Sequence, residues 1–185
     1  MRVIGGSARG IQLEAGPSKA VRPTTDRIKE SVFNILGSVE DCKVVDIFAG
    51  SGSLGLEALS RGAEEIIFIE KDKRTCKTIS DNLAKVEKSM GAKSNSKIIC
   101  GDYKKIFSSN FQPDVILTDP PYSDECALAK ELLRSEEFKS WCGEALVVLE
   151  YENRCKVLEE NSGWKIIRQK DFGTTGFLFL EVEDN

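Results

Sequence analysis

The stretch that decides the fold is residues 43–55, Lys-Val-Val-Asp-Ile-Phe-Ala-Gly-Ser-Gly-Ser-Leu-Gly. Its apolar first half, Val44 to Phe48, predicts a buried strand, and residues 54–61 predict the helix that follows. The glycines between them allow positive φ angles and close approach of the backbone to a ligand. The helix start behind them offers unpaired N–H groups and a positive dipole end. The stretch therefore predicts a ligand site where a strand turns into a helix.

Strands and helices alternate along the chain around this turn. A helix over 26–36, capped by Thr24 or Thr25 and stopped by Gly37, precedes it. The predicted strands are 43–48, 66–70, 97–100, 114–118 and 144–151, and the helices that follow the first four are 54–61, 72–88, 103–109 and 125–134. This alternation predicts an α/β, Rossmann-like fold with a mostly parallel sheet covered on both faces. Strands over 164–172 and 176–182 follow as an antiparallel hairpin.

The chain of 185 residues predicts one domain, residues 25–185, behind an N-terminal arm of residues 1–24. The net charge is −4, but residues 1–29 carry six basic side chains against two acidic ones. A basic arm on an acidic domain can contact phosphates locally. A solubilising terminus is the alternative that charge alone leaves open.

Residue types that the chain lacks exclude several chemistries. There is no histidine, which removes Ser-His-Asp and Cys-His catalysis and histidine metal sites. The closest two of the six cysteines are 13 residues apart, so no Cys-x-x-Cys pair exists and no metal site is predicted. Reduced, buried thiols in a cytoplasmic protein are expected instead. No apolar run is long enough to span a bilayer, and the N-terminus lacks a signal-peptide pattern.

Acidic residues lie at, or just beyond, the ends of three of the predicted strands. Glycine turns of this kind suit a dinucleotide as well, but Asp46, at the strand end, is unfavourable for a pyrophosphate and can accept from the ammonium of S-adenosylmethionine. Glu70 is placed to bind a ribose diol, and Asp102 an adenine amino group. The predicted cofactor site consists of Asp46, Phe48, Gly50, Ser51, Gly52, Gly55, Glu70 and Asp102.

A second motif, Asp119-Pro120-Pro121-Tyr122, follows the apolar run 114–118. Asp119 and the Pro120 carbonyl can accept two N–H bonds from an exocyclic amino group of a nucleobase, and Tyr122 can stack on the base. These four residues resemble the signature of amino methyltransferases that use S-adenosylmethionine. Taken alone, they also suit an ordinary strand exit with a rigid turn.

Nearly the whole chain resembles the RsmD-type 16S ribosomal RNA guanine-N2 methyltransferases. The matching segments are residues 2–6, 9–10, 22–34, 46–63, Glu70 and 119–122, of which Arg-Pro-Thr-Thr-Asp-Arg at 22–27 is the most specific to the family. The resemblance implies a seven-stranded methyltransferase fold and methylation of one guanine on the assembled or nearly assembled small ribosomal subunit. We expect a monomer that acts in the cytoplasm.

The predicted roles follow from both motifs and the resemblance. Asp119, Pro120, Pro121 and Tyr122 are the expected catalytic residues. Hydrogen bonds to Asp119 and Pro120 would pull the amino nitrogen toward tetrahedral geometry, and Asp119 would stabilise the developing positive charge. The expected RNA-binding residues, which position phosphates, are Arg2, Arg9, Arg22, Thr24 and Arg27. For the arginines, surface pairing with Asp26 or Glu30 is the alternative.

Three other functions remain possible at this point. A DNA or RNA adenine-N6 or cytosine-N4 methyltransferase would use the same four catalytic residues. A nicotinamide dehydrogenase would use the glycine turn, but it leaves Asp46 and Asp-Pro-Pro-Tyr unexplained. A non-catalytic binding module could retain the fold.

Overall fold

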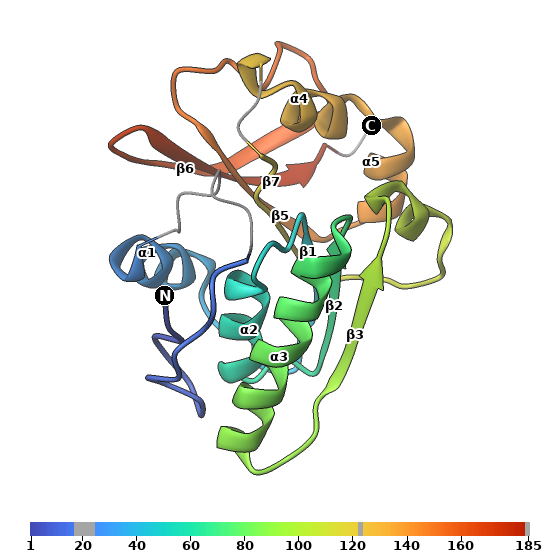
Figure 1. Ribbon diagram of the computed structural model, residues 1–185. Coiled ribbons are helices and arrows are strands. Elements are labelled where there is room, and N and C mark those ends of the chain that lie inside the picture. Colours follow the sequence, from blue (N-terminus) through green and yellow to red (C-terminus); the bar gives the residue numbers. More distant parts are fainter. Residues whose placement is uncertain (17–24, 122–123, 184–185) are drawn as a thin grey trace.

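A single seven-stranded sheet forms the centre of the computed structural model, which describes residues 1–16, 25–121 and 124–183 (Figure 1). The strands are β1 (Lys43–Ile47), β2 (Glu65–Glu70), β3 (Asn95–Cys100), β4 (Val115–Thr118), β5 (Leu146–Glu152), β6 (Trp164–Phe172) and β7 (Thr175–Val182). Their order is β3-β2-β1-β4-β5-β7-β6, with β1 to β5 parallel and β7 antiparallel to both of its neighbours. The predicted mostly parallel sheet with a C-terminal antiparallel hairpin is confirmed.

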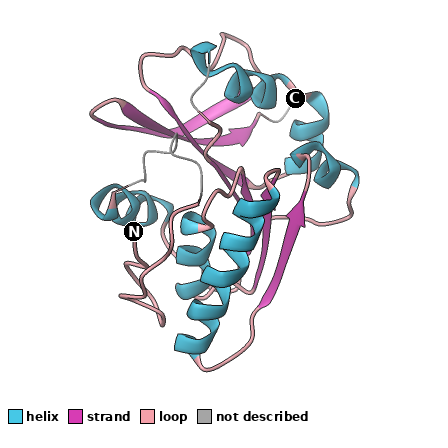
Figure 2. Cartoon of the chain, viewed as in Figure 1, coloured by secondary structure: helices cyan, strands magenta, loops and turns pink. Residues whose placement is uncertain are grey.

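Helices cover both faces of the sheet (Figure 2). The helical segments are α1 (Asp26–Leu36), α2 (Ser53–Ser60), α3 (Lys73–Met90), η1 (Tyr103–Ser108), η2 (Asp124–Cys126), α4 (Ala127–Arg134) and α5 (Glu136–Cys142). Helices α1, α2 and α3 pack into one apolar core, and η1, α4 and α5 into a second core on the other face. In the described part of the chain, no helix combines the length and apolar character that crossing a membrane requires.

Local capping explains where the helices begin and end. The Thr25 hydroxyl accepts from Ile28 N, and Gly37 ends α1 with a φ of 83°. Helix α3 carries an apolar stripe at helical spacing, with Cys76, Ile79 and Val86 buried. Helix α5 was not predicted, because its seven residues are too few for a clear periodic pattern.

The glycine turn between β1 and α2 depends on the absence of side chains. Gly52 has a φ of 79°, in the left-handed region that glycine adopts without strain. A Cβ atom on Gly55 would lie 2.5 Å from the Phe68 ring and 3.0 Å from Asp46 Oδ2. The third glycine therefore lets α2 pack directly against the sheet.

Residues 1–16 pack against the domain rather than extending from it. Val3, Ala8 and Leu13 are buried in the core that α2 and α3 share. The Ser60 hydroxyl accepts from Ala8 N at 2.9 Å and donates to the Gly5 carbonyl at 2.7 Å. This segment therefore contributes core side chains and backbone hydrogen bonds to the fold.

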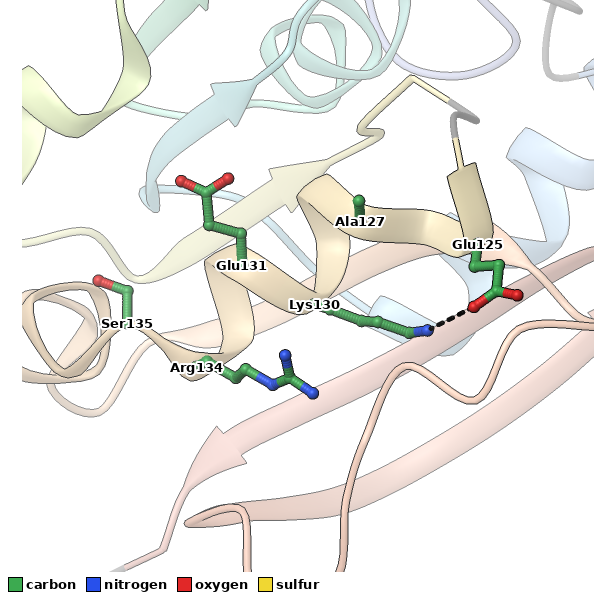
Figure 3. Close-up of a pocket in the computed structure, with 6 residues that line it drawn as sticks. All are labelled: Glu125, Ala127, Lys130, Glu131, Arg134 and Ser135. Carbon is green, nitrogen blue, oxygen red and sulfur yellow. Dashed lines mark ion pairs between the residues drawn. The ribbon is translucent and has the colours of Figure 1, made fainter.

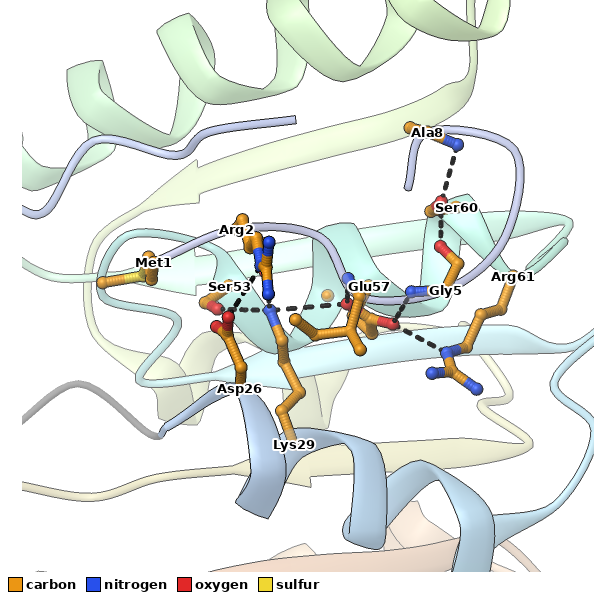
Figure 4. A network of polar contacts seen from close by, with 12 residues as sticks. Met1, Arg2, Gly5, Ala8, Asp26, Lys29, Ser53, Glu57, Ser60 and Arg61 are labelled. Atoms are coloured by element: carbon orange, nitrogen blue, oxygen red, sulfur yellow. Dashed lines mark hydrogen bonds and ion pairs between the residues drawn. The ribbon is translucent and has the colours of Figure 1, made fainter. Parts of the chain in front are cut away.

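A buried ionic network joins the N-terminal segment, α1 and α2 (Figure 4). The Glu57 carboxylate accepts from Ile4 N and Gly5 N at 2.7 and 2.8 Å, and it lies 3.4 Å from Lys29 Nζ. The Lys29 ammonium also donates to the Arg2 carbonyl and to the Ser53 hydroxyl. Burial lowers the pKa of Lys29, while the neighbouring Glu57 carboxylate opposes that shift. Lys29 thereby links the N-terminal segment to the first residue of α2 by hydrogen bonds.

One prediction about the cysteines was wrong. Cys126 and Cys155, expected as reduced thiols, form a disulfide with a Cα–Cα distance of 6.3 Å, while Cys42, Cys76, Cys100 and Cys142 are free. The two bonded residues are 29 positions apart in the sequence. Their spacing carries no disulfide signal, because the fold alone brings the segment after β5 next to η2.

The ionic network predicts that Glu57→Gln strongly destabilises the folded protein. That change leaves the Lys29 ammonium buried without its counter-ion, so we expect the free energy of unfolding to fall by about 3–5 kcal/mol. Urea denaturation measures this loss. The matched control, Asp81→Asn, removes only the exposed ion pair with Lys77 and should cost under about 0.5 kcal/mol. Equal losses in both variants would contradict the assigned role of Glu57.

Candidate functional site

Four acidic residues line the carboxyl edge of the sheet. Asp46 lies in β1, Glu70 ends β2, and Asp102 and Asp119 follow β3 and β4. Because these strands are neighbours in the order β3-β2-β1-β4, the acids follow one another along the edge as Asp102, Glu70, Asp46 and Asp119. In parallel α/β sheets, ligands bind beyond this edge.

Two of these acids hold the glycine turn in place. Asp46 Oδ2 accepts from Gly55 N at 2.9 Å, and Glu70 Oε2 accepts from Gly50 N at 3.0 Å. The other Glu70 oxygen accepts from Asp72 N at 2.9 Å. A carboxylate can accept about four hydrogen bonds, so both acids retain capacity for a ligand. The turn and its acids thus form one hydrogen-bonded unit.

The Asp46 carboxyl is buried, with 1% of its surface exposed. Burial raises the pKa of Asp46 to about 7; the Glu70 charge adds to the rise, and the bond from Gly55 opposes it. A cation placed beside Asp46 would favour its ionised form. The site is therefore suited to a ligand with a positive group at this position.

Aromatic rings form a wall beside the turn. Phe48 has a φ of 61°, which is uncommon for a residue other than glycine, and its ring centroid lies 4.8 Å from that of Tyr103. The Asp102 carboxylate accepts from Lys104 N at 3.0 Å and so caps η1, which contains Tyr103. Phe48 was a predicted site residue and Tyr103 was not, although the position of Tyr103 directly after Asp102 was a usable signal.

Ser51 and Gly52 complete the turn. The Ser51 hydroxyl donates to Met1 Sδ at 3.1 Å, and the Ser51 carbonyl accepts from Asn82 Nδ2 at 3.0 Å. Asn82 also accepts from Glu14 N, so it links the turn to the N-terminal segment. The turn is thereby held from α3 as well as from β1 and β2.

The Asp-Pro-Pro-Tyr motif begins where β4 ends. Asp119 N donates to the Ile47 carbonyl at 3.4 Å, Pro120 is buried and Pro121 is exposed. Tyr122 lies outside the described residues. Burial raises the pKa of Asp119 well above its ordinary value, and the charges of Glu150 and Asp46 raise it further.

Glu150 is a candidate functional residue that the sequence analysis missed. The parallel pairing of Thr118 with Leu149 places Glu150 beside Asp119. Glu150 is 4% exposed and lies opposite Phe177, whose ring belongs to the core under α1 and α2. No motif marks this acid, because only strand pairing brings it next to Asp119.

The predicted RNA-binding residues do not all lie together. Arg2 is exposed and pairs with Asp26 at 2.7 Å, next to the exposed Arg27. Arg9 is exposed but follows the segment bonded to Ser60, at the far end of α2 from the glycine turn. Arg22 and Thr24 lie outside the described residues. Of the predicted RNA-binding arginines that the structure describes, Arg2 and Arg27 therefore lie near each other, and Arg9 lies apart.

A surface cavity of about 590 Å³ lies along α4 (Figure 3). It is lined by Glu125, Ala127, Lys130, Glu131, Arg134 and Ser135. Lys130 lies 4.0 Å from Glu125, and Arg134 pairs with Glu159, so its cations have acidic neighbours. None of the predicted site residues lines this cavity.

Comparison with known proteins finds one family model along almost the whole chain. The model, described as conserved hypothetical protein 95, matches residues 1–181. The chain is 32% identical over 186 residues to ribosomal RNA small subunit methyltransferase D of Escherichia coli K12, covering 99% of this chain and 90% of that protein. The protein of the same name from Haemophilus influenzae is 33% identical over 187 residues, covering 100% and 94%.

Solved structures share the fold. The structure of yhhF from Escherichia coli has 29% identity and a TM-score of 0.78, covering 99% of this chain and 98% of that one. A precorrin-6y methyltransferase from Geobacter metallireducens has 18% identity and a TM-score of 0.68, covering 92% and 94%. At that identity the likeness concerns the fold alone.

The buried Asp46 predicts a stability that depends on pH. Its pKa rises from an ordinary value of 3.8 to about 7 on folding, so its contribution to stability is fully present below about pH 4 and is lost as pH rises through 7. Asp46→Asn keeps an acceptor for Gly55 N without the charge. Without ligand, we expect the variant to be more stable than the wild type by about 2–4 kcal/mol at pH 8.

That difference should shrink toward zero near pH 4, where the wild-type acid is protonated. Urea denaturation at both pH values measures it, with Asp81→Asn as the exposed control. A difference that is the same at pH 4 and pH 8 would show that the Asp46 charge is not the cause.

Proposed function

Because the chain belongs to the RsmD family, matched by the model of conserved hypothetical protein 95, we propose that it methylates 16S ribosomal RNA. The methyl group comes from S-adenosylmethionine, and the acceptor is the N2 amino group of one guanine. The observation that carries the proposal is the single edge where the glycine turn, Glu70, Asp46 and Asp119 follow one another. The two curated relatives described above are both named as small subunit methyltransferases.

The residues around the turn fit this cofactor chemically. S-adenosylmethionine supplies an electrophilic methyl group on a positively charged sulfur. Asp46 would pair with the ammonium of its amino acid part, and Glu70 would accept from the ribose hydroxyls. Phe48 and Asp102 would contact the adenine, from its face and at its amino group. Gly50 and Gly52 leave room for the ligand to approach the backbone.

Asp119 and Pro120 would act on the acceptor base. The guanine amino nitrogen is a poor nucleophile, because its lone pair is conjugated with the ring. Hydrogen bonds from this amino group to the Asp119 carboxylate and the Pro120 carbonyl would pull the nitrogen toward tetrahedral geometry. Tyr122 would stack on the base once it has rotated out of its surroundings.

The reaction balances in charge and atoms at Asp119. S-adenosylmethionine would supply the methyl group that bonds to the nitrogen, and the electron pair of the broken carbon–sulfur bond would stay on sulfur. The Asp119 carboxylate would stabilise the positive charge that develops on the nitrogen. The released proton then passes to Asp119, which its raised pKa makes a suitable acceptor.

The substrate would be recognised mainly by its shape. We infer that the assembled or nearly assembled small subunit presents the guanine to a monomer of this protein in the cytoplasm. Arg2 and Arg27, with Arg22 and Thr24 beside them in sequence, would position backbone phosphates, and so would Arg9.

Transfer of labelled methyl groups tests the proposal. Small subunits without base methylation, protein-free 16S RNA, transfer RNA and unmethylated DNA serve as substrates, and digestion identifies the labelled nucleoside. We expect N2-methylguanosine in the subunit, and at least a 100-fold loss of rate in Asp119→Ala, on the order seen when electrostatic groups at the reacting atom are removed. Binding of S-adenosylhomocysteine controls for folding.

Other outcomes overturn parts of this proposal. Label in adenine or cytosine would replace guanine as the target but retain the amino-group chemistry. Cofactor binding without label in any substrate would support a non-catalytic module. An active Asp119→Ala variant would remove Asp119 from the mechanism.

The position of Glu150 beside Asp119 predicts that its substitution changes the dependence of kcat on pH. Its charge contributes to the raised pKa of Asp119, so Glu150→Gln should lower that pKa and move the acidic limb of kcat to lower pH. The matched control is Glu152→Gln in the same strand, where Arg154 pairs with the carboxylate at 2.9 Å. An unchanged limb in a folded Glu150→Gln variant would show that Glu150 does not tune the site.

A further inference from the structure

Strand β6 forms an exposed, basic edge of the sheet. It is the last strand in the order β3-β2-β1-β4-β5-β7-β6 (Figure 1). Residues 165–171 are exposed along its length. Its cations are Lys165, Arg168 and Lys170. With three cations and one acid, Asp171, the strand carries a net positive charge on a chain of net charge −4, which marks a local surface for an anionic partner.

Strand pairing places Lys170 in the same row as Asp119. Asp119 lies beside Glu150, Glu150 pairs with Phe177, and Phe177 pairs with Lys170. Directly opposed residues point to the same face of a sheet. Three strand spacings of about 4.8 Å put Lys170 about 14 Å from Asp119.

Arg168 extends this basic surface on the same face. It pairs with Phe179, and both Phe177 and Phe179 belong to the core under α1 and α2. Within residues 1–16, 25–121 and 124–183, neither Arg168 nor Lys170 forms an ion pair, and Lys170 Nζ lies 5.9 Å from the centre of the Phe172 ring. Both cations therefore remain available to an outside anion.

The strand also carries exposed apolar surface and a bulge. Ile166 and Ile167 are 50% and 44% exposed. The pairing with β7 shifts between Ile166 and Arg168, and such a bulge increases the local twist of an edge strand. Apolar contact area beside two free cations suits a nucleic acid strand, which presents sugars and bases next to phosphates.

We propose that Arg168 and Lys170 bind phosphates of the RNA strand that flanks the methylated nucleotide. This inference rests on the proposed function, because it names a contact of the same substrate. About 14 Å corresponds to roughly four stacked nucleotides at 3.4 Å each. The β6 edge is thus within reach of the RNA on one side of the target, while Arg2 and Arg27 lie by α1.

The double variant Arg168→Gln/Lys170→Gln tests this contact. We expect its affinity for 16S RNA to fall on the order of tenfold, and the slope of log affinity against log salt to become shallower by about 2, one for each phosphate contact. The KM for RNA should rise while kcat at saturating RNA stays within about twofold. Binding of S-adenosylhomocysteine should not change, since neither residue lies at the glycine turn.

Lys165→Gln is the matched control. Lys165 lies in the same strand but about 16 Å from Lys170, toward the amino edge, and its Nζ is 3.9 Å from Glu181. Lysines on edge strands also prevent unwanted strand pairing, and this control removes such a lysine without removing the proposed contact. We expect its RNA affinity and salt slope to match the wild type.

Two results overturn the inference. The first is a double variant whose RNA affinity and salt slope equal those of the wild type or of Lys165→Gln. The second is an equal loss of affinity for double-stranded DNA, which would mark a general polyanion surface. If the wild type methylates no ribosomal RNA, the proposed function fails, whereas the salt slopes on the same RNA still decide whether β6 binds it.

Discussion

The hydrogen bonds between two carboxylates, the buried Asp46 and the half-buried Glu70, and the glycine turn are the interaction on which the site depends. Asp46 accepts from Gly55 and Glu70 from Gly50, so two neighbouring strands hold one turn at both of its ends. The backbone of the turn can adopt this shape because Gly52 has a positive φ and Gly55 has no Cβ to meet the Phe68 ring. Helix α2 then begins against the sheet, and its first residue, Ser53, receives the Lys29 ammonium. The chain start and α1 are thus attached to the same turn.

Charged side chains in the interior have two kinds of surroundings in this fold: opposite charges in one place and like charges in another. Around Glu57, a carboxylate meets Lys29 and Arg61 together with two backbone N–H groups, so opposite charges offset much of the desolvation cost. At the carboxyl edge, Asp46, Asp119 and Glu150 lie near one another, and charge repulsion adds to burial in raising the pKa of Asp119. The first arrangement stabilises the fold. The second raises the pKa of Asp46 and of Asp119, which suits the binding of a cationic ligand and proton transfer.

Much of this architecture could be predicted from local patterns. The apolar run before Gly50, the cap at Thr25, the stop at Gly37 and the stripe on α3 are all signals within a single element, and the structure contains each of them. The seven-residue α5 was missed because its pattern is too short. The disulfide between Cys126 and Cys155 was missed because it joins segments that approach each other only in the folded chain.

By itself, the sequence determined the order of strands and helices and the acids that follow the strands, because each of these depends on residues close together in the chain. Only the tertiary structure decided which residues from different strands meet. Glu150 lies beside Asp119 because β4 pairs with β5. Lys170 lies level with both acids because Phe177 of β7 pairs with Glu150 on one side and with Lys170 on the other. Arg9, which sequence alone grouped with Arg2, lies toward the other end of α2. The physical reason is that strand register and order are set by long-range hydrogen bonding and core packing, which a linear pattern does not encode.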